Sequence, residues 1–397
     1  MKINFGFIIF IGIFFTLYAS LHFYFYRKVT RAFNISLVPC IILIIVLCIL
    51  MLMPILMRVM EGKCSEGLTT AITYIGYVWM GIIFLLFAFN LSVDIYRLII
   101  NIFSHIFSHS LTKLVPDKRI TLLVIMILTA FINLYGMYEA WNINTRVITL
   151  KTDKLPKGIE KLRIIQVSDI HFSRINGIRL ADRIADIVTL LKPDILVSTG
   201  DLIDDGLQYP DKVEVLFKSI GTKYGKFAVT GNHEFFGALL KNIKFTEDCG
   251  FQVLRNEGVK INEFINIAGV DDHAANNSGH VKKAVESTAM EGFSPEQINI
   301  FLKHQPRIVR SDIGKFDIQL SGHTHGGQIF PFGYLVGMMY KYMRGIYYLG
   351  NNSYIYVSRG TGTWGPPVRF LSPPEITVID FEKDKTYKNK IRMKING

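Results

Sequence analysis

The chain is poor in cysteine and has no cysteine motif. Three of its four cysteines lie in or beside the hydrophobic first third, and Cys249 stands alone in the remainder. One cysteine cannot make a disulfide framework there, and the lack of a CxxC pair argues against a thiolate zinc site. Cysteine usage therefore does not define a redox compartment.

The chain also lacks a run of Lys and Arg of the kind expected for a duplex-binding face, so no nucleic-acid partner is predicted. Its formal net charge of +12 is spread over both parts, since residues 1–140 and the remainder are each net basic. Such an excess fits an anionic membrane surface or a phosphorylated substrate better than a nucleic acid.

Four stretches contain no Asp, Glu, Lys or Arg: residues 3–26, 32–57, 67–93 and 120–138. A membrane-spanning helix needs about 20 mostly apolar residues, so each stretch is long enough. The first has too long an apolar core for a signal peptide and no clear cleavage site, so we expect it to be retained. Residues 1–140 are thus predicted to be an all-α, multi-pass domain of the cell membrane with about four transmembrane helices. No span has a charge at its centre, so we expect anchoring rather than an ion pathway.

The loops between these spans differ in their content of basic residues. The first and third loops hold seven Lys and Arg, against three on the other side. Because cytoplasmic loops are enriched in Lys and Arg, these two loops are expected in the cytoplasm and both termini outside. The second part of the chain would then be extracytoplasmic.

Five short motifs follow in a fixed order, and four of them come directly after a short apolar run. Such runs predict buried strands, whose carboxyl ends form the usual ligand-binding edge of an open α/β sheet. Any one motif alone could be an ordinary turn, but their number and order favour one site of carboxylate, amide and imidazole groups. The motifs are Ser168-Asp169-Ile170-His171, Gly200-Asp201-Leu202-Ile203-Asp204, Gly231-Asn232-His233-Glu234, Lys303-His304 and Gly322-His323-Thr324-His325-Gly326-Gly327.

This series resembles the signature of the calcineurin-like metallophosphoesterase superfamily, D-x-H, G-D-x-x-D, G-N-H-[DE], H and G-H-x-H, with every position filled. Residues 358–369 and 373–376 look like the membrane-associated bacterial branch related to the YkuE and YaeI phosphoesterases. The resemblance covers roughly residues 145–382 and implies an α/β (α+β) four-layer sandwich of two sheets. Residues 383–397 are polar and rich in Lys, which predicts a frayed tail.

The resemblance further implies a site for two divalent metal ions. A bridging carboxylate holds such ions roughly 3.5–4 Å apart, so that both can polarise one phosphate. Mixed oxygen and imidazole ligands suit manganese, iron or zinc and disfavour calcium and magnesium. The implied ligands are Asp201 as the bridge, Asp169, His171 and His325 at the first ion, and Asn232, His304 and His323 at the second.

His233 is the expected catalytic residue. By resemblance it protonates the leaving oxygen or stabilises charge on the phosphoryl group, and an imidazole with a pKa of about 6.5 can do either near neutrality. Asp204 and Glu234 are expected behind the ligands, each orienting a ligand histidine through a ring N–H.

Three other features each have more than one interpretation. The segment 271–273, Asp-Asp-His, fits a supporting role at the site or a plain polar loop. Arg359 and Arg369 could clamp an anionic head group or form salt bridges at the rim. Residues 330–342, rich in aromatics and Met, could fill the core, line an acyl-chain groove or dip into a membrane interface.

Together these features predict a membrane-anchored hydrolase of a phosphodiester or pyrophosphate bond, in which a metal-bound hydroxide attacks phosphorus. The membrane helices and the aromatic segment favour a lipid-linked substrate. A nucleotide–lipid pyrophosphate is one option, although it would be cytoplasmic and so conflict with the predicted topology. An envelope phosphatase or phosphodiesterase acting on soluble esters is the alternative. A membrane sensor or scaffold that only binds ligand is disfavoured, because no metal ligand is missing.

Overall fold

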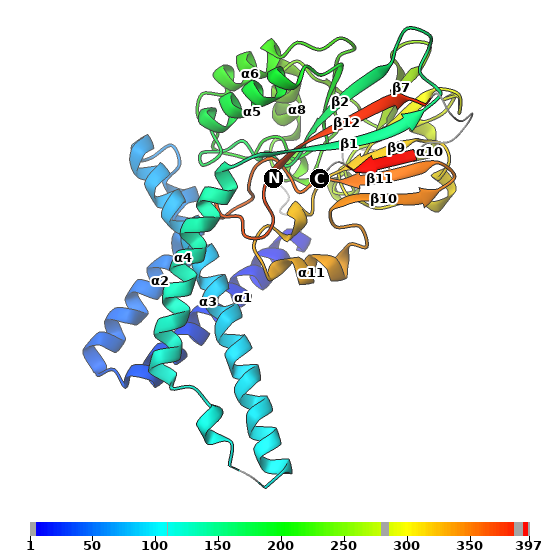
Figure 1. The fold of residues 1–397 in the computed structure, drawn as a ribbon. Coiled ribbons are helices and arrows are strands. Elements are labelled where there is room, and N and C mark those ends of the chain that lie inside the picture. Colours follow the sequence, from blue (N-terminus) through cyan, green and yellow to red (C-terminus); the bar gives the residue numbers. More distant parts are fainter. Residues whose placement is uncertain (1–4, 109, 279–285, 385–391, 396–397) are drawn as a thin grey trace. The chain divides into compact units, whose positions relative to one another are not determined.

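The computed structural model describes residues 5–108, 110–278, 286–384 and 392–395 (Figure 1). Within this part the chain forms two compact units. The first contains the N-terminal helices up to Tyr138 together with the short segment Gly365–Val368. The second contains Glu139–Trp364 and the chain from Arg369 onward, and all five motifs belong to it.

The N-terminal unit consists of long, apolar helices. Three of them, α2, α3 and α4, are long and apolar enough to cross a membrane, with a mean hydropathy of 3.3 in α2. Many of their Ile, Leu and Val side chains are exposed, as lipid rather than water would favour. The described part of the predicted span 3–26 lies in α1, and its crossing of the membrane stays a prediction. The helices are α1 (Phe5–Phe33), α2 (Leu37–Met60), α3 (Glu66–Ile106) and α4 (Lys118–Trp141), with a 3-10 turn at Thr112–Leu114.

The second unit is built on two mixed β-sheets. The first sheet has the order β13-β1-β12-β2-β3-β4-β5 and the second the order β10-β11-β9-β8-β7-β6. Strands β2, β3 and β4 are parallel neighbours, as are β7, β8 and β9, so their carboxyl ends meet at one edge of each sheet. The first sheet comprises β1 (Asn144–Thr152), β2 (Lys161–Val167), β3 (Ile195–Ser198), β4 (Lys226–Ala228), β5 (Gln252–Val253), β12 (Glu375–Lys383) and β13 (Arg392–Ile395). The second comprises β6 (Glu257–Lys260), β7 (Ile265–Gly269), β8 (Ile298–Leu302), β9 (Ile318–Ser321), β10 (Gly345–Gly350) and β11 (Ser353–Val357).

Apolar layers hold the sheets and helices together. Ile164 of β2 and Leu320 of β9 belong to the buried cluster between the two sheets. Alternate residues of the first sheet face the other way and pack on α5, α6 and α8, which lie together over that sheet in Figure 1. The far face of the second sheet is covered more thinly, by α10 and its neighbours. The helices and turns of this unit are α5 (Ile178–Leu191), α6 (Pro210–Ser219), α7 (Asn232–Phe236), α8 (Leu239–Asp248), α9 (Ala275–Ser278), α10 (Glu286–Ala289), α11 (Phe332–Met339) and 3-10 turns at Arg310–Asp312 and His325–Gly327. This two-sheet α/β architecture after apolar helices confirms the predicted fold class.

Part of the C-terminal tail differs from its prediction. Residues 392–395 form β13, which pairs antiparallel with β1, where the polar composition predicts a frayed end. An edge strand offers a row of unpaired backbone groups, and a polar segment can bond to them whatever its side chains. The tail residues 385–391 and 396–397 lie outside the described part of the chain.

Candidate metal centre

The motif residues follow strand ends of both sheets and lie together at one site. Backbone hydrogen bonds tie the loops to one another, from Asp169 N–H to Gly200 C=O and from Gly322 N–H to His304 C=O. The first sheet supplies Asp169 and His171 after β2, Asp201 after β3, and Asn232 and His233 after β4, while the second supplies His304 after β8 and His323 and His325 after β9. The motifs thus come from the edges of two sheets rather than from the edge of one sheet.

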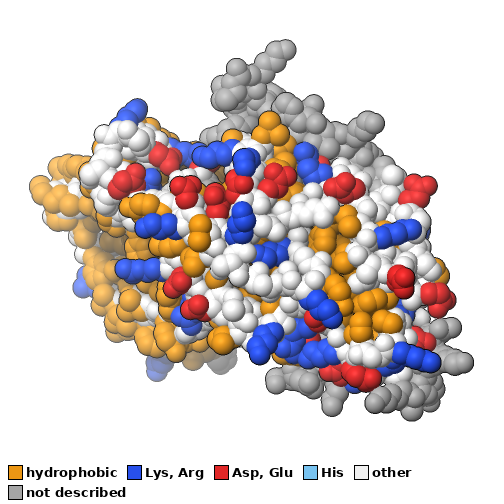
Figure 2. Space-filling model, turned by 90° about the horizontal axis from the view of Figure 1, so that it is seen from above, with side chains coloured by type: hydrophobic (Ala, Val, Ile, Leu, Met, Phe, Trp, Pro, Cys, Tyr) orange, Lys and Arg blue, Asp and Glu red, His pale blue; other side chains and the backbone are white. Residues whose placement is uncertain are grey.

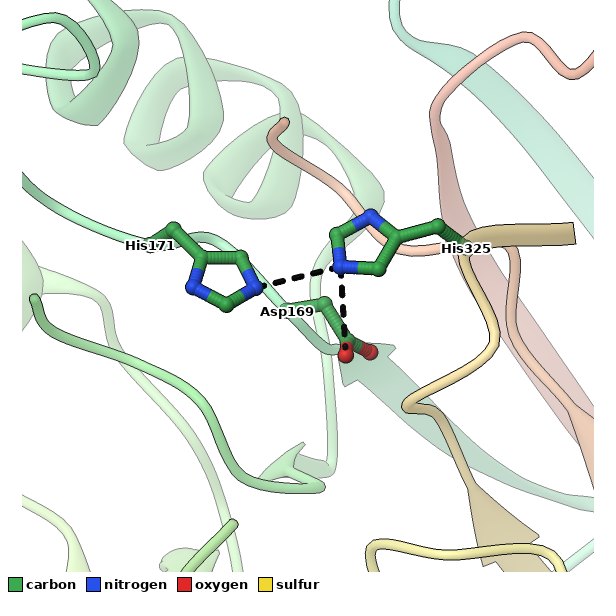
Figure 3. Close-up of side chains that lie close together, drawn as sticks. All are labelled: Asp169, His171 and His325. Atoms are coloured by element: carbon green, nitrogen blue, oxygen red, sulfur yellow. Dashed lines mark hydrogen bonds and ion pairs between the residues drawn. The ribbon is translucent and has the colours of Figure 1, made fainter. Parts of the chain in front are cut away.

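Asp169, His171 and His325 form the first group of possible ligands (Figure 3). The Nε2 atoms of His171 and His325 are 3.1 Å apart, and His325 Nε2 lies 3.6 Å from Asp169 Oδ1. Figure 3 shows both rings and the carboxylate turned toward one point. All three side chains are buried, as expected for a site that excludes bulk water.

Asn232, His304 and His323 form the second group. Nε2 of His304 lies 3.1 Å from Asn232 Oδ1 and 3.1 Å from His323 Nδ1. The other ring nitrogen of His304 lies 2.8 Å from the Thr199 carbonyl oxygen, to which it donates its proton. Nε2 is therefore the ring nitrogen that faces the second group and the one that could bind a cation.

Asp201 lies between the two groups. Its Oδ2 atom is 3.2 Å from His304 Nε2 and 3.8 Å from His171 Nε2. Metal–nitrogen bonds are about 2.1 Å long, so two ligands at right angles are about 3 Å apart. The spacing of the nitrogen and oxygen atoms therefore fits divalent cations, with one carboxylate within reach of both positions.

The backbone at these residues is strained. Five of them have a positive φ, in the left-handed region that residues other than glycine rarely adopt. These are Asp169 (50°), His171 (52°), Asp201 (52°), His323 (72°) and His325 (49°). Each such residue costs of order 1 kcal/mol, and such strain concentrates at functional sites. This backbone conformation accompanies the grouping of their side chains at the candidate metal centre.

Two motif glycines are required because carboxylates approach the backbone closely. A Cβ atom on Gly231 would lie 2.1 Å from Asp201 Oδ1, and one on Gly322 would lie 2.1 Å from Asp169 Oδ2. Gly231 has φ of −100°, which any residue can adopt. Lack of space, rather than a sharp turn, therefore requires glycine there.

The two acidic residues behind the ligands have different roles. Asp204 Oδ1 lies 3.1 Å from His171 Nδ1 and 2.7 Å from His233 Nδ1, so it orients a histidine as expected. The expectation for Glu234 is wrong. Its buried carboxylate instead accepts hydrogen bonds from the backbone N–H groups of Gly231, Asp201 and Leu202. Glu234 therefore joins the second and third motif loops.

Burial and charge set the protonation of the ligand groups. Burial alone would raise the pKa of Asp201, but the charges of His304 and His233 outweigh it and hold that pKa well below its usual value. Burial, followed by the charge of His304, lowers the pKa of His323 to about 3. Burial, together with His171 and Arg369, lowers the pKa of His325 as well. Burial would lower the pKa of His304, but the charge of Asp201 outweighs that effect and raises it. An ionised carboxylate and neutral imidazoles are the forms that bind metal ions, so His304 loses a proton when a cation binds.

The pKa of His233 shifts in the opposite direction to the pKa values of His323 and His325. Burial would lower its pKa, but the charge of Asp201 and the hydrogen bond to Asp204 outweigh that effect and raise it to about 9. The ring lies edge-on to Trp364, with centroids 6.0 Å apart, and the side chain stays 19% exposed. A partly exposed imidazolium beside the ligand groups is suited to donate a proton.

Arg369 and Asp271 have structural roles, whereas Asp272, next to Asp271, belongs to a chain of contacts that reaches His323. Arg369 is fully buried and donates hydrogen bonds to the carbonyl oxygens of Gly362 and Ser372, so it is neither an anion clamp nor a rim salt bridge. Asp271 is buried and paired with Arg255 at 2.9 Å.

Residues outside the five motifs form a chain of polar contacts behind His323. His323 Nε2 lies 2.7 Å from the Tyr340 hydroxyl, which donates to Gln305 Oε1 at 3.4 Å. Gln305 Nε2 in turn donates to Asp272 Oδ1 at 3.1 Å. With Nε2–H directed at Tyr340, His323 presents Nδ1 to the second group.

Comparison with known proteins agrees with this geometry. The calcineurin-like phosphoesterase family model matches residues 162–327. A metallophosphoesterase from Aquifex aeolicus is 37% identical over 255 residues, which are 64% of this chain and 97% of that protein. The metallophosphoesterase YkuE from Bacillus subtilis is 36% identical over 62% of this chain and 88% of its own length. A transmembrane protein with metallophosphoesterase domain from Danio rerio is 30% identical over 64% of this chain and 61% of its own length. The chain therefore belongs to the calcineurin-like metallophosphoesterase family and is a metal-dependent phosphoester hydrolase.

Proposed function

We propose that the chain is a membrane-anchored, two-metal hydrolase that cleaves a phosphodiester or pyrophosphate bond of a lipid-linked substrate. The position of Asp201 carries the proposal, because Oδ2 lies 3.2 Å from a nitrogen of one ligand group and 3.8 Å from a nitrogen of the other. A carboxylate shared between two ligand groups is what two-metal phosphoesterases require.

The ligand groups divide between two ions. Manganese, iron or zinc suit their mixture of imidazole and oxygen donors. When bound, such a pair of ions polarises the phosphate and supplies a water nucleophile at neutral pH. Asp169, His171 and His325 would hold one ion and Asn232, His304 and His323 the other, with Asp201 shared.

His233 would supply the proton that the leaving oxygen needs. Its Nδ1–H donates to Asp204, so the proton available for transfer is the one on Nε2. Its backbone N–H donates to Asp201 Oδ1 at 2.9 Å, which fixes the position of this residue relative to the shared carboxylate. As the bond from phosphorus to the leaving oxygen breaks, that oxygen takes the Nε2 proton and departs neutral.

Two features favour a substrate held in a membrane. The three membrane-spanning candidates precede the phosphoesterase unit, and an exposed apolar helix, α11, follows the last motif. A tether raises the effective concentration of a membrane-bound substrate without any new contact. We place the domain on the extracytoplasmic side, because the first and third loops hold seven of the ten basic residues of the membrane part.

The test uses the full-length protein in detergent with Mn²⁺ and a total bacterial lipid extract, read by mass spectrometry. Asp201→Ala and His233→Ala proteins run beside it. We expect a phospholipid or lipid-pyrophosphate species to disappear with the wild type alone. If no lipid changes while an aryl phosphodiester is cleaved, the lipid-linked substrate is wrong and a soluble ester takes its place. If the wild type cleaves neither a lipid nor the aryl phosphodiester, the proposed hydrolase activity is wrong.

A further inference from the structure

Helix α11 is an apolar helix whose side chains face outward. No residue of α11 is buried. Tyr334, Met338 and Met339 are 71%, 84% and 75% exposed, and Phe332 and Leu335 are exposed as well. Of the three interpretations of this stretch, the structure excludes core filling for α11. Contiguous apolar surface of this kind on a folded domain marks an interaction site.

The chain segment that carries α11 has charged side chains of one sign only. The sequence contains no Asp or Glu between Asp317 and Glu375, whereas Lys341 and Arg344 follow the helix directly and are exposed. The exposed Arg307 adds a third cation, 5.7 Å from the centre of the Tyr340 ring. The face of the molecule in Figure 2 differs, because acidic and basic side chains are interspersed across it. Exposed apolar side chains flanked by cations are complementary to an anionic lipid surface.

Both ends of α11 are joined to the candidate metal centre. At its start, Gly333 packs against Gly327, so closely that a Cβ on Gly327 would lie 2.3 Å from Gly333 Cα. At its end, Tyr340 contacts His323 Nε2 at 2.7 Å. A membrane that receives α11 would therefore lie beside the groups that would bind the phosphate.

We propose that the outward side chains of α11 insert into the interface of an anionic bilayer, with Lys341, Arg344 and Arg307 at the head groups, and so bring a lipid-linked phosphate to the metal centre. This inference rests on the proposed function and names the surface that serves it. The bilayer is favoured over a second copy of the chain, because two surfaces with the same cationic rim repel each other.

The first test measures insertion directly and needs no activity. Full-length protein without its native cysteines is placed in nanodiscs of phosphatidylcholine and phosphatidylglycerol, with a spin label at Met338→Cys. Leu190→Cys on α5 is the matched control, since Leu190 is 80% exposed. We expect the label at 338 to be relaxed by oxygen and shielded from a water-soluble nickel chelate, and the label at 190 to show the reverse. Equal nickel access at both positions would overturn the inference, as would spin–spin broadening from a second copy.

The second test separates docking from chemistry. Met338→Glu and Met339→Glu should lower the hydrolysis of a phospholipid substrate in nanodiscs about tenfold and leave cleavage of a soluble aryl phosphodiester unchanged. Leu190→Glu should change neither rate. Unchanged hydrolysis of the nanodisc substrate, or an equal loss on both substrates, would overturn the docking role. If the wild type cleaves neither substrate, the proposed function fails, and the label at 338 still decides whether α11 inserts.

Discussion

At the scale of single residues, Asp204 links the proposed ligand groups to the proposed proton donor. One of its oxygens contacts Nδ1 of His171 and Nδ1 of His233. A carboxylate in this position fixes which ring nitrogen carries the proton and where the ring points. Metal binding and proton transfer therefore depend on the same side chain.

We expect Asp204→Asn to weaken binding of Mn²⁺ about 10- to 100-fold, because His171 loses its charged partner. Isothermal titration of the metal-free protein measures the affinity. The neighbouring Asp205→Asn serves as control and should bind as the wild type does. An unchanged affinity in Asp204→Asn would show that His171 needs no orientation from this carboxylate.

Tyr340 gives a second prediction at this scale. Tyr340→Phe removes the hydroxyl that meets His323 Nε2 and keeps the ring. One of two bound ions should then bind about tenfold more weakly, while the other is unaffected. Competition with a chelator resolves the two affinities, and Tyr342→Phe is the control. Equal weakening of both ions would contradict the assignment of His323 to one group.

The meeting of the motif residues at one centre could be predicted from the sequence because the motifs are local, each within a few residues of a strand end. Tyr340 and Gln305 could not be predicted, since they meet His323 through the fold and follow no spacing. The role of Glu234 was also hidden. A carboxylate that bonds to three backbone N–H groups leaves no pattern in the side chains around it.

At the scale of the elements, an ion pair links β2 to β12, with its carboxylate buried and its guanidinium partly exposed. Arg163 and Asp380 lie opposite each other, and Arg163 Nε donates to Asp380 Oδ1 at 2.8 Å. Burial alone would raise the pKa of Asp380, but hydrogen bonds from Arg163 and Lys161 outweigh it and lower that pKa. A lowered pKa in the folded state stabilises the fold above the unfolded pKa of about 3.9. That stability is lost as the pH falls through the folded value.

Asp380→Asn should therefore lower the free energy of unfolding by about 2 kcal/mol at neutral pH. It should also flatten the loss of stability on acidification below about pH 4. Denaturant unfolding at several pH values measures both effects, with the exposed Asp186→Asn as control. A variant as acid-sensitive as the wild type would show that the pair contributes little.

Strands β2, β3 and β9 could be predicted because each is a short apolar run that ends at a motif. The exposure of α11 could not, because an apolar run reads the same whether it faces a core or a membrane. Strand β13 was missed for a related reason. Its pairing with β1 depends on backbone groups and not on the polar side chains that predicted a frayed end.

At the scale of the whole molecule, the orientation in the membrane decides which substrates are within reach. If the chain has four spans, the count of basic residues predicts that the C-terminus lies outside the cytoplasm. A C-terminal fusion to alkaline phosphatase should therefore be active in a bacterial host, and a fusion to green fluorescent protein should be dark. The opposite pair of results would place the domain in the cytoplasm and favour a nucleotide–lipid pyrophosphate.

Two metal ions that share Asp201 would be revealed by a single titration. Metal-free protein receives Mn²⁺ in steps, while bound metal and cleavage of an aryl phosphodiester are followed together, beside Asp201→Ala. We expect two ions per chain, with activity that appears as the second one binds, and little metal binding or activity in Asp201→Ala. Full activity with one ion, or in Asp201→Ala, would contradict this expectation.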